Sequence, residues 1–397
     1  MDSGVSSSVL HYMKNGSWIR KLFDEGISLK QQFGENNVFD FSLGNPIIEP
    51  PEQFISALRE EIIHNQSGKY RYIPNQGLQE AREQVSHFLS ERYHTKFSYQ
   101  HIVMTVGAGG GLNVALKSIL NPGDEVIILS PYFVEYHYYV INNGGVTVYC
   151  DLNDQFEIDY DEISKALSAK TKAIIVNTPH NPTGTAFTQV NLNRLGQQLT
   201  EASQKYEKTI YMIFDEPYGQ LLYDEETVHP FKAYLNTILV SSFSKDLGIA
   251  GERLGYIAIR PEIQNANLLV NAFIFCNRTL GFVNAPALMQ RAIARMDTLF
   301  IDSTPYLIRR ELIIGVLQDA GYEFIRPKGG FFVFPKSPIK DDVEFCMVAA
   351  QKFRLLIVPG SGFGREGYFR ISYSVPIDVI ENSRTIFSEL FQYFSKR

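Results

Sequence analysis

The stretch HIVMTVGAGGGLNVALKSIL, residues 101–120, joins a short apolar run directly to a helical pattern. Its first six residues are mostly apolar and β-branched, as in a buried strand. Further on, five apolar residues recur at the spacing that places them on one face of a helix: Leu112, Ala115, Leu116, Ile119 and Leu120. The stretch therefore predicts a buried strand that leads into an amphipathic helix.

This alternation continues to about residue 260. Five more apolar runs have the length of strands: EVIILS (125–130), KAIIVN (172–177), IYMIF (210–214), TILVSS (237–242) and LGYIAI (254–259). Helical patterns follow the first two. Apolar strands that alternate with helices predict an α/β fold, with a mostly parallel sheet covered on both faces. In such sheets, ligands bind beyond the carboxyl ends of the strands.

The last hundred residues have a different pattern. EFCMVAAQKF (344–353) predicts a short helix, LLIVPG (355–360) and YFRISYS (368–374) predict strands, and residues 377–394 predict one final helix. We expect an α+β second domain here. The first sixty or so residues have no sheet of their own, and we expect them to pack on this second domain.

The composition excludes several classes of protein. The chain has 397 residues, and 37 Lys and Arg against 43 Asp and Glu give a net charge of −6. That balance argues against a nucleic acid or an anionic membrane as partner. Cys150, Cys276 and Cys346 are too far apart to indicate a disulfide framework or a metal site, so we expect a reducing, cytoplasmic location. We see no signal peptide, and no apolar run approaches the roughly 20 residues of a membrane span.

Polar residues and glycines gather where the predicted strands end. They are residues 107–111, Asn181, Asp215 with Tyr218, and Ser242 and Ser244 with Lys245. Because these positions follow four different strands, we expect them to face one crevice.

Lys245 is a candidate nucleophile. An amine must be neutral to attack an aldehyde, so its pKa must fall from about 10.4. Burial and the nearby cation of Arg253 would both lower it. A solvated surface charge is the simpler interpretation of any single lysine. The position of Lys245 after an apolar strand, beside Ser242 and Ser244, weakens that interpretation but leaves it open.

The glycines at 107–111 open a helix, where free backbone N–H groups and the helix dipole suit a phosphate. A tight turn without a ligand is one alternative. A dinucleotide-binding fingerprint is another, but it needs glycine where this chain has Leu112. It also needs an acidic residue at the end of the next strand, whereas Asp124 and Glu125 stand at its start.

Asp215 also allows two interpretations. It could cap a helix or a turn, or its carboxylate could keep a ring nitrogen protonated. In the second case Tyr218, three residues on, would reach an adjacent substituent of the ring. NPTG (181–184) has the composition of a turn, from which Asn181 could still donate a hydrogen bond.

Taken together and in order, five motifs resemble the class I/II aminotransferases, the fold-type I, aspartate-aminotransferase-like enzymes that use pyridoxal 5'-phosphate. They are TPHNPTG (178–184), FDEPYG (214–219), SSFSK (241–245), GERLGY (251–256) and YFRISYS. The resemblance runs from SLGNP (42–46) to the final helix. It implies a large cofactor-binding domain at 63–297, with a mostly parallel seven-stranded sheet flanked by helices. A smaller α+β domain would combine an N-terminal arm and segment at 1–62 with residues 298–397.

The resemblance also implies roles for single residues. Lys245 would form the internal aldimine and carry a proton during catalysis, while Asp215 would pair with the pyridine nitrogen. Asn181 and Tyr218 would bind the ring 3'-oxygen, and Phe133 would stack on the ring. Five residues would hold the phosphate: Ala108, Gly109, Ser242, Ser244 and Arg253.

Other roles concern the substrate and a partner subunit. Arg370 would clamp the substrate α-carboxylate in a bidentate pair, with Gly44 closing over it and Asn181 beside it. Tyr72 would reach the phosphate in the partner's site, which implies a homodimer. Arg278 is the candidate for binding a side-chain carboxylate; the alternative is a surface charge at a helix end.

The reaction implied is a ping-pong transfer of an amino group from an L-amino acid to a 2-oxo acid, with aspartate/glutamate or broad specificity. The run SPYFVEYHYY (130–139) could form an apolar substrate wall or pack in a helix core. Trp18 could lie over the entrance to the site, contact the partner or simply pack.

Three alternatives remain open. The same fold could catalyse carbon–sulfur β-elimination or another pyridoxal-phosphate reaction. The chain could be a regulator that binds the cofactor without turnover, although it has too little sequence before residue 42 for a DNA-binding domain. It could also be a nicotinamide-dependent oxidoreductase that uses the glycine turn.

Overall fold

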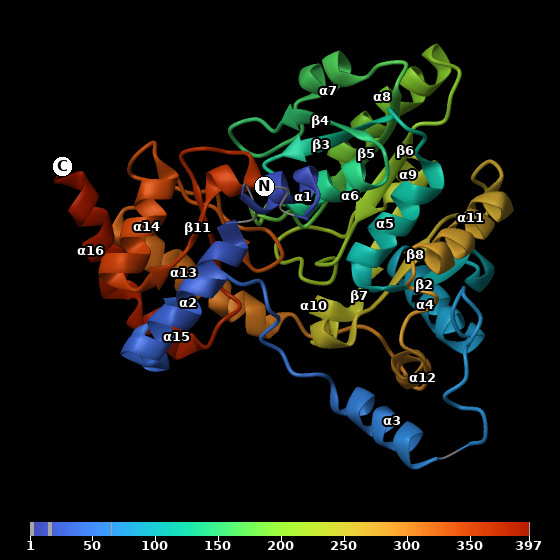
Figure 1. Ribbon diagram of the computed structural model, residues 1–397, viewed down its shortest axis with the longest axis horizontal. Coiled ribbons are helices and arrows are strands. Elements are labelled where there is room, and N and C mark those ends of the chain that lie inside the picture. Colours follow the sequence, from blue (N-terminus) through green and yellow to red (C-terminus); the bar gives the residue numbers. More distant parts are fainter. Residues whose placement is uncertain (1–3, 15–17, 65, 397) are drawn as a thin grey trace. The chain divides into compact units, whose positions relative to one another are not determined.

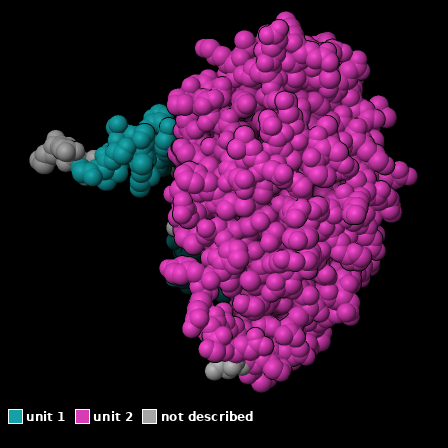
Figure 2. All heavy atoms as spheres, turned by 90° about the vertical axis from the view of Figure 1, so that its right-hand side faces the viewer, with its two compact units in different colours: residues 1–44, 308–326, 331–397 teal, residues 45–307, 327–330 magenta. Residues whose placement is uncertain are grey.

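The structure is a computed structural model that describes residues 4–14, 18–64 and 66–396. These residues form two compact units (Figure 2). Unit 1 comprises Met1–Gly44, Ile308–Arg326 and Phe331–Arg397, and unit 2 comprises Asn45–Leu307 and Pro327–Gly330. The N-terminal boundary falls after Gly44 rather than after residue 62, because α3 (Glu52–Ile63) packs on α12 (Ala287–Ala294) within unit 2.

Unit 2 contains a seven-stranded sheet (Figure 1). In spatial order its strands are β2 (Ile102–Val106), β8 (Leu254–Ala258), β7 (Thr237–Ser242), β6 (Tyr211–Asp215), β5 (Thr171–Asn177), β3 (Glu125–Ser130) and β4 (Val146–Asp151). Only β8 is antiparallel to its neighbours, β2 and β7. The predicted α/β fold with a mostly parallel seven-stranded sheet is therefore confirmed.

Ten helices of the described chain lie wholly within unit 2. They are α3, α4 (Gln79–Arg92), α5 (Gly107–Ile119), α6 (Glu135–Asn142), α7 (Tyr160–Ala166), α8 (Gln189–Lys205), α9 (Pro230–Ala233), α10 (Phe243–Asp246), α11 (Ala266–Thr279) and α12. As predicted, α5 follows β2 directly. Its apolar face packs on β7 and β8, and α11 lies alongside it (Figure 1).

Unit 1 is built from both ends of the chain. The N-terminal part has α1 (Ser7–Lys14), α2 (Trp18–Phe33) and β1 (Phe39–Asp40), and β1 pairs in parallel with β10 (Leu355–Leu356). The side chain of Trp18 lies outside the described residues. A second, antiparallel sheet has the order β11 (Val358–Pro359), β12 (Phe369–Ser372) and β9 (Phe332–Val333).

The C-terminal helices of unit 1 complete this α+β unit. They are most of α13 (Thr304–Ala320), α14 (Asp342–Phe353), α15 (Ile377–Asn382) and α16 (Arg384–Ser395). The single final helix predicted from the sequence is therefore wrong. Buried Ser383 separates α15 from α16, and its hydroxyl donates to the Ile380 carbonyl at 2.7 Å, a local bond that competes with a continuous helix. Within the described residues, no helix is both long and apolar enough to cross a bilayer.

Candidate active site

Three of the predicted residues of unit 2, Asn181, Asp215 and Lys245, end or follow the neighbouring strands β5, β6 and β7. β5, β6 and β7 run parallel, with Asn177 in register with Asp215, and Asp215 in register with Val240. The segments that carry Asn181, Asp215 and Lys245 therefore all leave the sheet at the carboxyl ends of parallel strands, on the same side of the sheet.

Asp215 is buried and held from two sides. The Tyr136 hydroxyl, from α6, donates a hydrogen bond to its Oδ2. The Asn177 side-chain amide donates to the Asp215 backbone carbonyl at 2.9 Å, and Asn177 Oδ1 accepts from the Asn181 N–H at 2.8 Å. Asp215 Oδ1 is buried without a hydrogen-bond partner among the described residues. One carboxylate oxygen is thus fixed, and the other is a buried acceptor.

The surroundings of Asp215 disfavour its charge. Burial raises its pKa to about 7; the Tyr136 hydrogen bond opposes this rise, and the neighbouring Glu216 carboxylate adds to it. A cationic donor placed at Oδ1 would restore the ionised form.

This electrostatic cost predicts that Asp215→Asn stabilises the cofactor-free protein at alkaline pH. The folded-state pKa of about 7 lies above the ordinary value of 3.8. The stability contribution of Asp215 is therefore fully present below about pH 4 and is lost as the pH rises through 7. We expect the variant's free energy of unfolding to exceed that of wild type by roughly 1–4 kcal/mol at pH 8. Urea unfolding of both cofactor-free proteins at pH 4 and pH 8 measures this, and an equal difference at the two pH values would contradict it.

Gly107 and Arg253 form a cradle at the start of α5. Gly107 has φ +66°, and a Cβ at this position would lie 2.7 Å from Arg253 Nη2. The other terminal nitrogen of Arg253, Nη1, donates to the Ala250 carbonyl at 2.9 Å. A guanidinium thus lies against a glycine at a helix N-terminus. An anion is stabilised at such a place, and a side chain at residue 107 would fill it.

The other predicted cofactor residues of unit 2 lie on the same elements. Gly109 is in the first turn of α5, where an added Cβ would meet the Tyr139 hydroxyl at 3.0 Å. Ala108 is partly buried. Ser242 ends β7 and is buried, as is Ser244, whereas Lys245 in α10 is half-buried. Phe133 lies edge-on to Tyr136, with ring centroids 5.5 Å apart, and Tyr218 is buried.

Arg370 and Gly44 belong to unit 1, where they share a neighbour. Arg370 is buried, and its guanidinium carbon lies 4.5 Å from the Phe332 ring centroid and 4.7 Å from that of Phe363. Its Nη2 donates to the Ser42 carbonyl at 2.7 Å. A Cβ on Gly44 would lie 2.9 Å from Phe332. The rings of Phe332 and Phe363 and the carbonyl of Ser42 therefore fix the plane of the Arg370 guanidinium.

Tyr72 and Arg278 are exposed in the single chain. Tyr72 is 92% exposed, and with Arg71, Phe282 and Pro286 it lines an open hollow of about 680 Å³. Arg278 lies in the last turn of α11, and its guanidinium carbon is 5.7 Å from the Phe275 ring centroid. Neither residue contributes to the buried cluster around Asp215.

Comparison with known proteins identifies the family. The family model for aminotransferase class I and II matches residues 36–384. The chain belongs to the class I and II aminotransferases. The aminotransferase is 30% identical to an aspartate aminotransferase of Pyrococcus abyssi, over 93% of this chain and 94% of that protein. It is also 30% identical to aromatic-amino-acid aminotransferase 2 of Thermococcus litoralis, over 94% of each chain.

A solved structure supports the same conclusion. An amino transferase from Eubacterium rectale superimposes with a TM-score of 0.93, at 32% identity, over 98% of this chain and 99% of that one. The protein is an aminotransferase that depends on pyridoxal phosphate and uses amino acids and 2-oxo acids. The predicted family, fold, enzyme class and cofactor are thereby confirmed.

The described residues of the aminotransferase fit this cofactor at two points. Asp215 Oδ1 is an orphaned buried acceptor, suited to a protonated pyridine nitrogen. The Gly107–Arg253 cradle is suited to a phosphate. An anion-binding end and a carboxylate end are the two groups that a phosphorylated pyridinium requires.

The sequence analysis missed one residue of the aminotransferase site, Tyr136. It lies in the run at 130–139, for which a substrate wall and helix-core packing were the two interpretations. The structure divides this run: Tyr136 is buried and donates to Asp215, whereas the Tyr139 hydroxyl lies near Gly109. Phe133 precedes α6 (Glu135–Asn142), so helical spacing within the aromatic run does not single out Tyr136.

Proposed function

We propose that this aminotransferase moves the amino group of an L-amino acid to a 2-oxo acid in two half-reactions, with Lys245, Asp215 and Arg370 as its central residues. The observation that carries the proposal is the Asp215 carboxylate, buried, bonded to Tyr136 through one oxygen and orphaned at the other. Bound pyridoxal phosphate supplies an electron sink for negative charge at the substrate Cα.

Positions in the fold support the roles proposed for these residues. Asp215 holds a proton on the ring nitrogen, which its buried Oδ1 favours because no donor among the described residues satisfies that oxygen. Lys245 binds the cofactor through its amine and moves the proton at the substrate Cα. Asn181 and Tyr218 bind the ring oxygen, and Phe133 stacks on the ring.

The phosphate role is assigned to residues around the start of α5. They are Ala108, Gly109, Ser242, Ser244 and Arg253, with the Arg253 guanidinium lying against Gly107. Small residues at this turn leave room for an anion to approach the backbone N–H groups.

For the substrate, we propose aspartate/glutamate or broad specificity. Arg370 binds the α-carboxylate through its planar fork, and Gly44 closes over it, with Asn181 beside the substrate. Arg278 is proposed to bind a side-chain carboxylate in a neighbouring subunit, which its exposed position at the end of α11 allows. Relatives named for aspartate and for aromatic amino acids are equally similar to this chain.

We also propose a homodimer in which Tyr72 reaches the partner's phosphate. Two large aromatic side chains, Tyr70 at 75% and Tyr72 at 92%, are exposed beside an open hollow, and a second copy would cover them. Sedimentation as a monomer at micromolar concentration would contradict this proposal.

The buried thiols of Cys150, Cys276 and Cys346 support a reducing, cytoplasmic location.

The visible absorption of the protein loaded with pyridoxal phosphate tests the proposal. Single L-amino acids are added, aspartate and glutamate first, followed by phenylalanine and tyrosine. We expect loss of the yellow band together with one equivalent of 2-oxo acid per site. A persistent band with accumulating ammonia would indicate elimination instead. A protein that acquires no visible band would refute the role of Lys245.

Arg370→Ala is expected to weaken binding of the amino acid rather than catalysis. A charge-assisted hydrogen bond contributes about 1.5–3 kcal/mol, so losing the fork should raise KM by roughly 10- to 100-fold or more. Steady-state kinetics with aspartate measure this, with Arg326→Ala as the control, because Arg326 is half exposed and pairs with Glu311 on the surface of the same unit. An unchanged KM would exclude the proposed role.

A further inference from the structure

Each of the two catalytic motifs contains a buried carboxylate beside its proposed catalytic residue. In FDEPYG, Glu216 follows Asp215, and in SFSKD, Asp246 follows Lys245. Glu216 and Asp246 are 5% and 6% exposed, and the roles proposed above use neither of them. Burying an ionisable group is costly unless it is paired, so these two carboxylates require an explanation.

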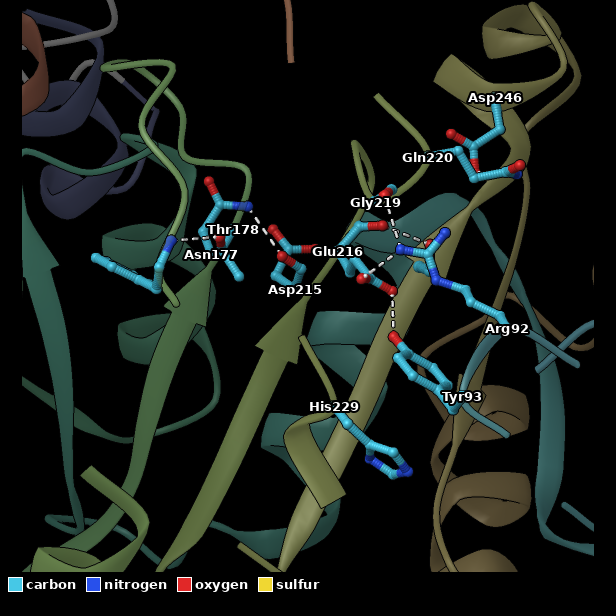
Figure 3. Close-up of polar contacts among 12 residues, drawn as sticks. Arg92, Tyr93, Asn177, Thr178, Asp215, Glu216, Gly219, Gln220, His229 and Asp246 are labelled. Atoms are coloured by element: carbon cyan, nitrogen blue, oxygen red, sulfur yellow. Dashed lines mark hydrogen bonds and ion pairs between the residues drawn. The ribbon is translucent and has the colours of Figure 1, made fainter. Parts of the chain in front are cut away.

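Arg92, the last residue of α4, is the cation that faces them. Its Nη2 donates to Glu216 Oε1 at 2.9 Å and to the Gly219 carbonyl at 2.7 Å (Figure 3). The Tyr93 hydroxyl donates to the other Glu216 oxygen, Oε2, at 2.6 Å. Both oxygens of Glu216 are therefore held by the last residue of α4 and the residue that follows it, whereas the carboxylate of Asp215 is held by α6.

Gln220 extends this network to the lysine turn. Its side-chain amide donates to Asp246 Oδ2 at 3.0 Å and to the Leu299 carbonyl at 3.0 Å, and its Oε1 accepts from the Ile301 N–H. Together, Arg92, Tyr93, Glu216, Gln220 and Asp246 are called the Arg92 cluster. The cluster joins the segment that carries Asp215 and Tyr218 to the turn that carries Lys245.

The backbone of Glu216 makes the same connection. Its N–H donates to the Val240 carbonyl at 2.9 Å, and its carbonyl accepts from the Ser241 hydroxyl at 2.8 Å. Both partners lie on β7, which leads directly into Ser242, Ser244 and Lys245. A shift of Glu216 would therefore be transmitted to both catalytic segments.

Gly219 provides the space that the ion pair occupies. A Cβ at residue 219 would lie 2.5 Å from Glu216 Cδ and 2.7 Å from Arg92 Nη2. A methyl group there would displace the pair without removing a charge or a hydrogen-bonding side chain.

The charges near Arg92 keep its buried guanidinium ionised. Burial alone would lower the pKa of Arg92, but the Glu216 carboxylate, with smaller contributions from Tyr93 and Asp246, holds it above its ordinary value. Burial raises the pKa of Asp246 to about 7, against hydrogen bonding from Gln220 and the charge of Arg92. Arg92 thus remains charged beside the Glu216 carboxylate.

We infer that Glu216 and Arg92 are positioning residues for amino transfer, because their ion pair fixes the segment of Asp215 and Tyr218 against the turn of Lys245. The inference rests on the proposed roles of Asp215 and Lys245. It assigns a positioning function to Glu216 and Gly219 of the FDEPYG motif. It assigns the same function to Arg92 of α4, which is far from them in sequence.

Three variants test the inference in the enzyme loaded with pyridoxal phosphate. Glu216→Gln removes the charge and keeps the shape. Because it leaves Arg92 uncompensated, the double variant Arg92→Met with Glu216→Gln removes both charges together. Gly219→Ala displaces the pair and leaves both charges in place. Glu262→Gln is the control, because Glu262 pairs with Arg260 at 2.7 Å in the same unit but is half exposed.

Four quantities are measured: kcat, KM for the amino donor, the dissociation constant of pyridoxal phosphate, and the visible circular dichroism per unit absorbance. The dichroism reports the orientation of the bound cofactor without turnover. We expect each of the three variants to lower kcat by about tenfold or more, with KM within about twofold of wild type. We also expect altered dichroism in each variant, and no change in the control.

The contrary result is equally clear. If the folded variants melt at a lower temperature but keep the wild-type kcat and dichroism, the pair is only structural and the inference is wrong. Wild-type protein that acquires no visible band would instead refute the underlying role of Lys245. The two failures are therefore distinguishable.

Discussion

Lys245→Ala is expected to lower turnover by at least 10²–10⁴-fold, the contribution that a positioned acid–base group makes to a proton transfer. The loss should exceed this range, because the same amine is also the proposed attachment point of the cofactor. Lys245 is half-buried in α10, and the other residues of that short helix are Phe243, Ser244 and Asp246, so no second lysine of the helix replaces it.

Single-turnover absorbance measurements with aspartate or glutamate check this expectation. Lys165→Ala is the matched control, since Lys165 is an exposed lysine in the same unit that pairs with Glu162 on its own helix. If the Lys245 variant turns over at near the wild-type rate, the nucleophile has been assigned to the wrong residue.

Asp215→Asn is the second change with a large expected effect. It keeps the shape of the side chain and an acceptor for Tyr136, but it removes the negative charge from the buried site. Preorganised electrostatic groups of this kind contribute about 10²–10³-fold to kcat. We therefore expect a loss of that size in the loaded enzyme, the opposite in sign to the gain in stability expected for the cofactor-free protein.

Rapid-mixing absorbance with a saturating amino donor measures the effect on catalysis. Asp161→Asn, at an exposed position in α7, is the control for a change of one charge. A variant that keeps half of the wild-type rate would show that the Asp215 charge is not used. Urea unfolding of the cofactor-free Asp215→Asn protein measures what burying the carboxylate costs in stability. The rate of the loaded variant measures what the same carboxylate contributes to catalysis.

The strands and the site at their ends were predictable from the sequence because their signals are local. Apolar runs such as EVIILS and TILVSS match β3 and β7 residue for residue, since buried parallel strands are continuous in hydrophobicity. Asp215 stands at the end of such a run and Lys245 three residues after another, so their place beyond the carboxyl ends of the strands followed from the order of the chain.

What could not be predicted depends on tertiary context. β4 is an edge strand whose side chains are mostly outside the core, so VTVYCD lacks the continuous apolar character of the other strands. The pair of Arg92 and Glu216 joins residues 124 positions apart, and no spacing rule connects α4 with the end of β6. Tyr136 belongs to an aromatic run that is visible in the sequence, but its hydrogen bond to Asp215 depends on how α6 packs on the sheet.

The strand order of unit 2 has a consequence for synthesis of the chain. β2 is the first of the seven strands of this sheet in sequence. Within the sheet it pairs only with β8, which is the last of the seven in sequence. At roughly 5–20 residues per second, a ribosome needs on the order of 10–30 s to make the residues between them. During that interval the apolar segment 102–106 has no strand partner in the nascent chain. It is therefore the part of this sheet most exposed to chaperones and to aggregation before the fold closes.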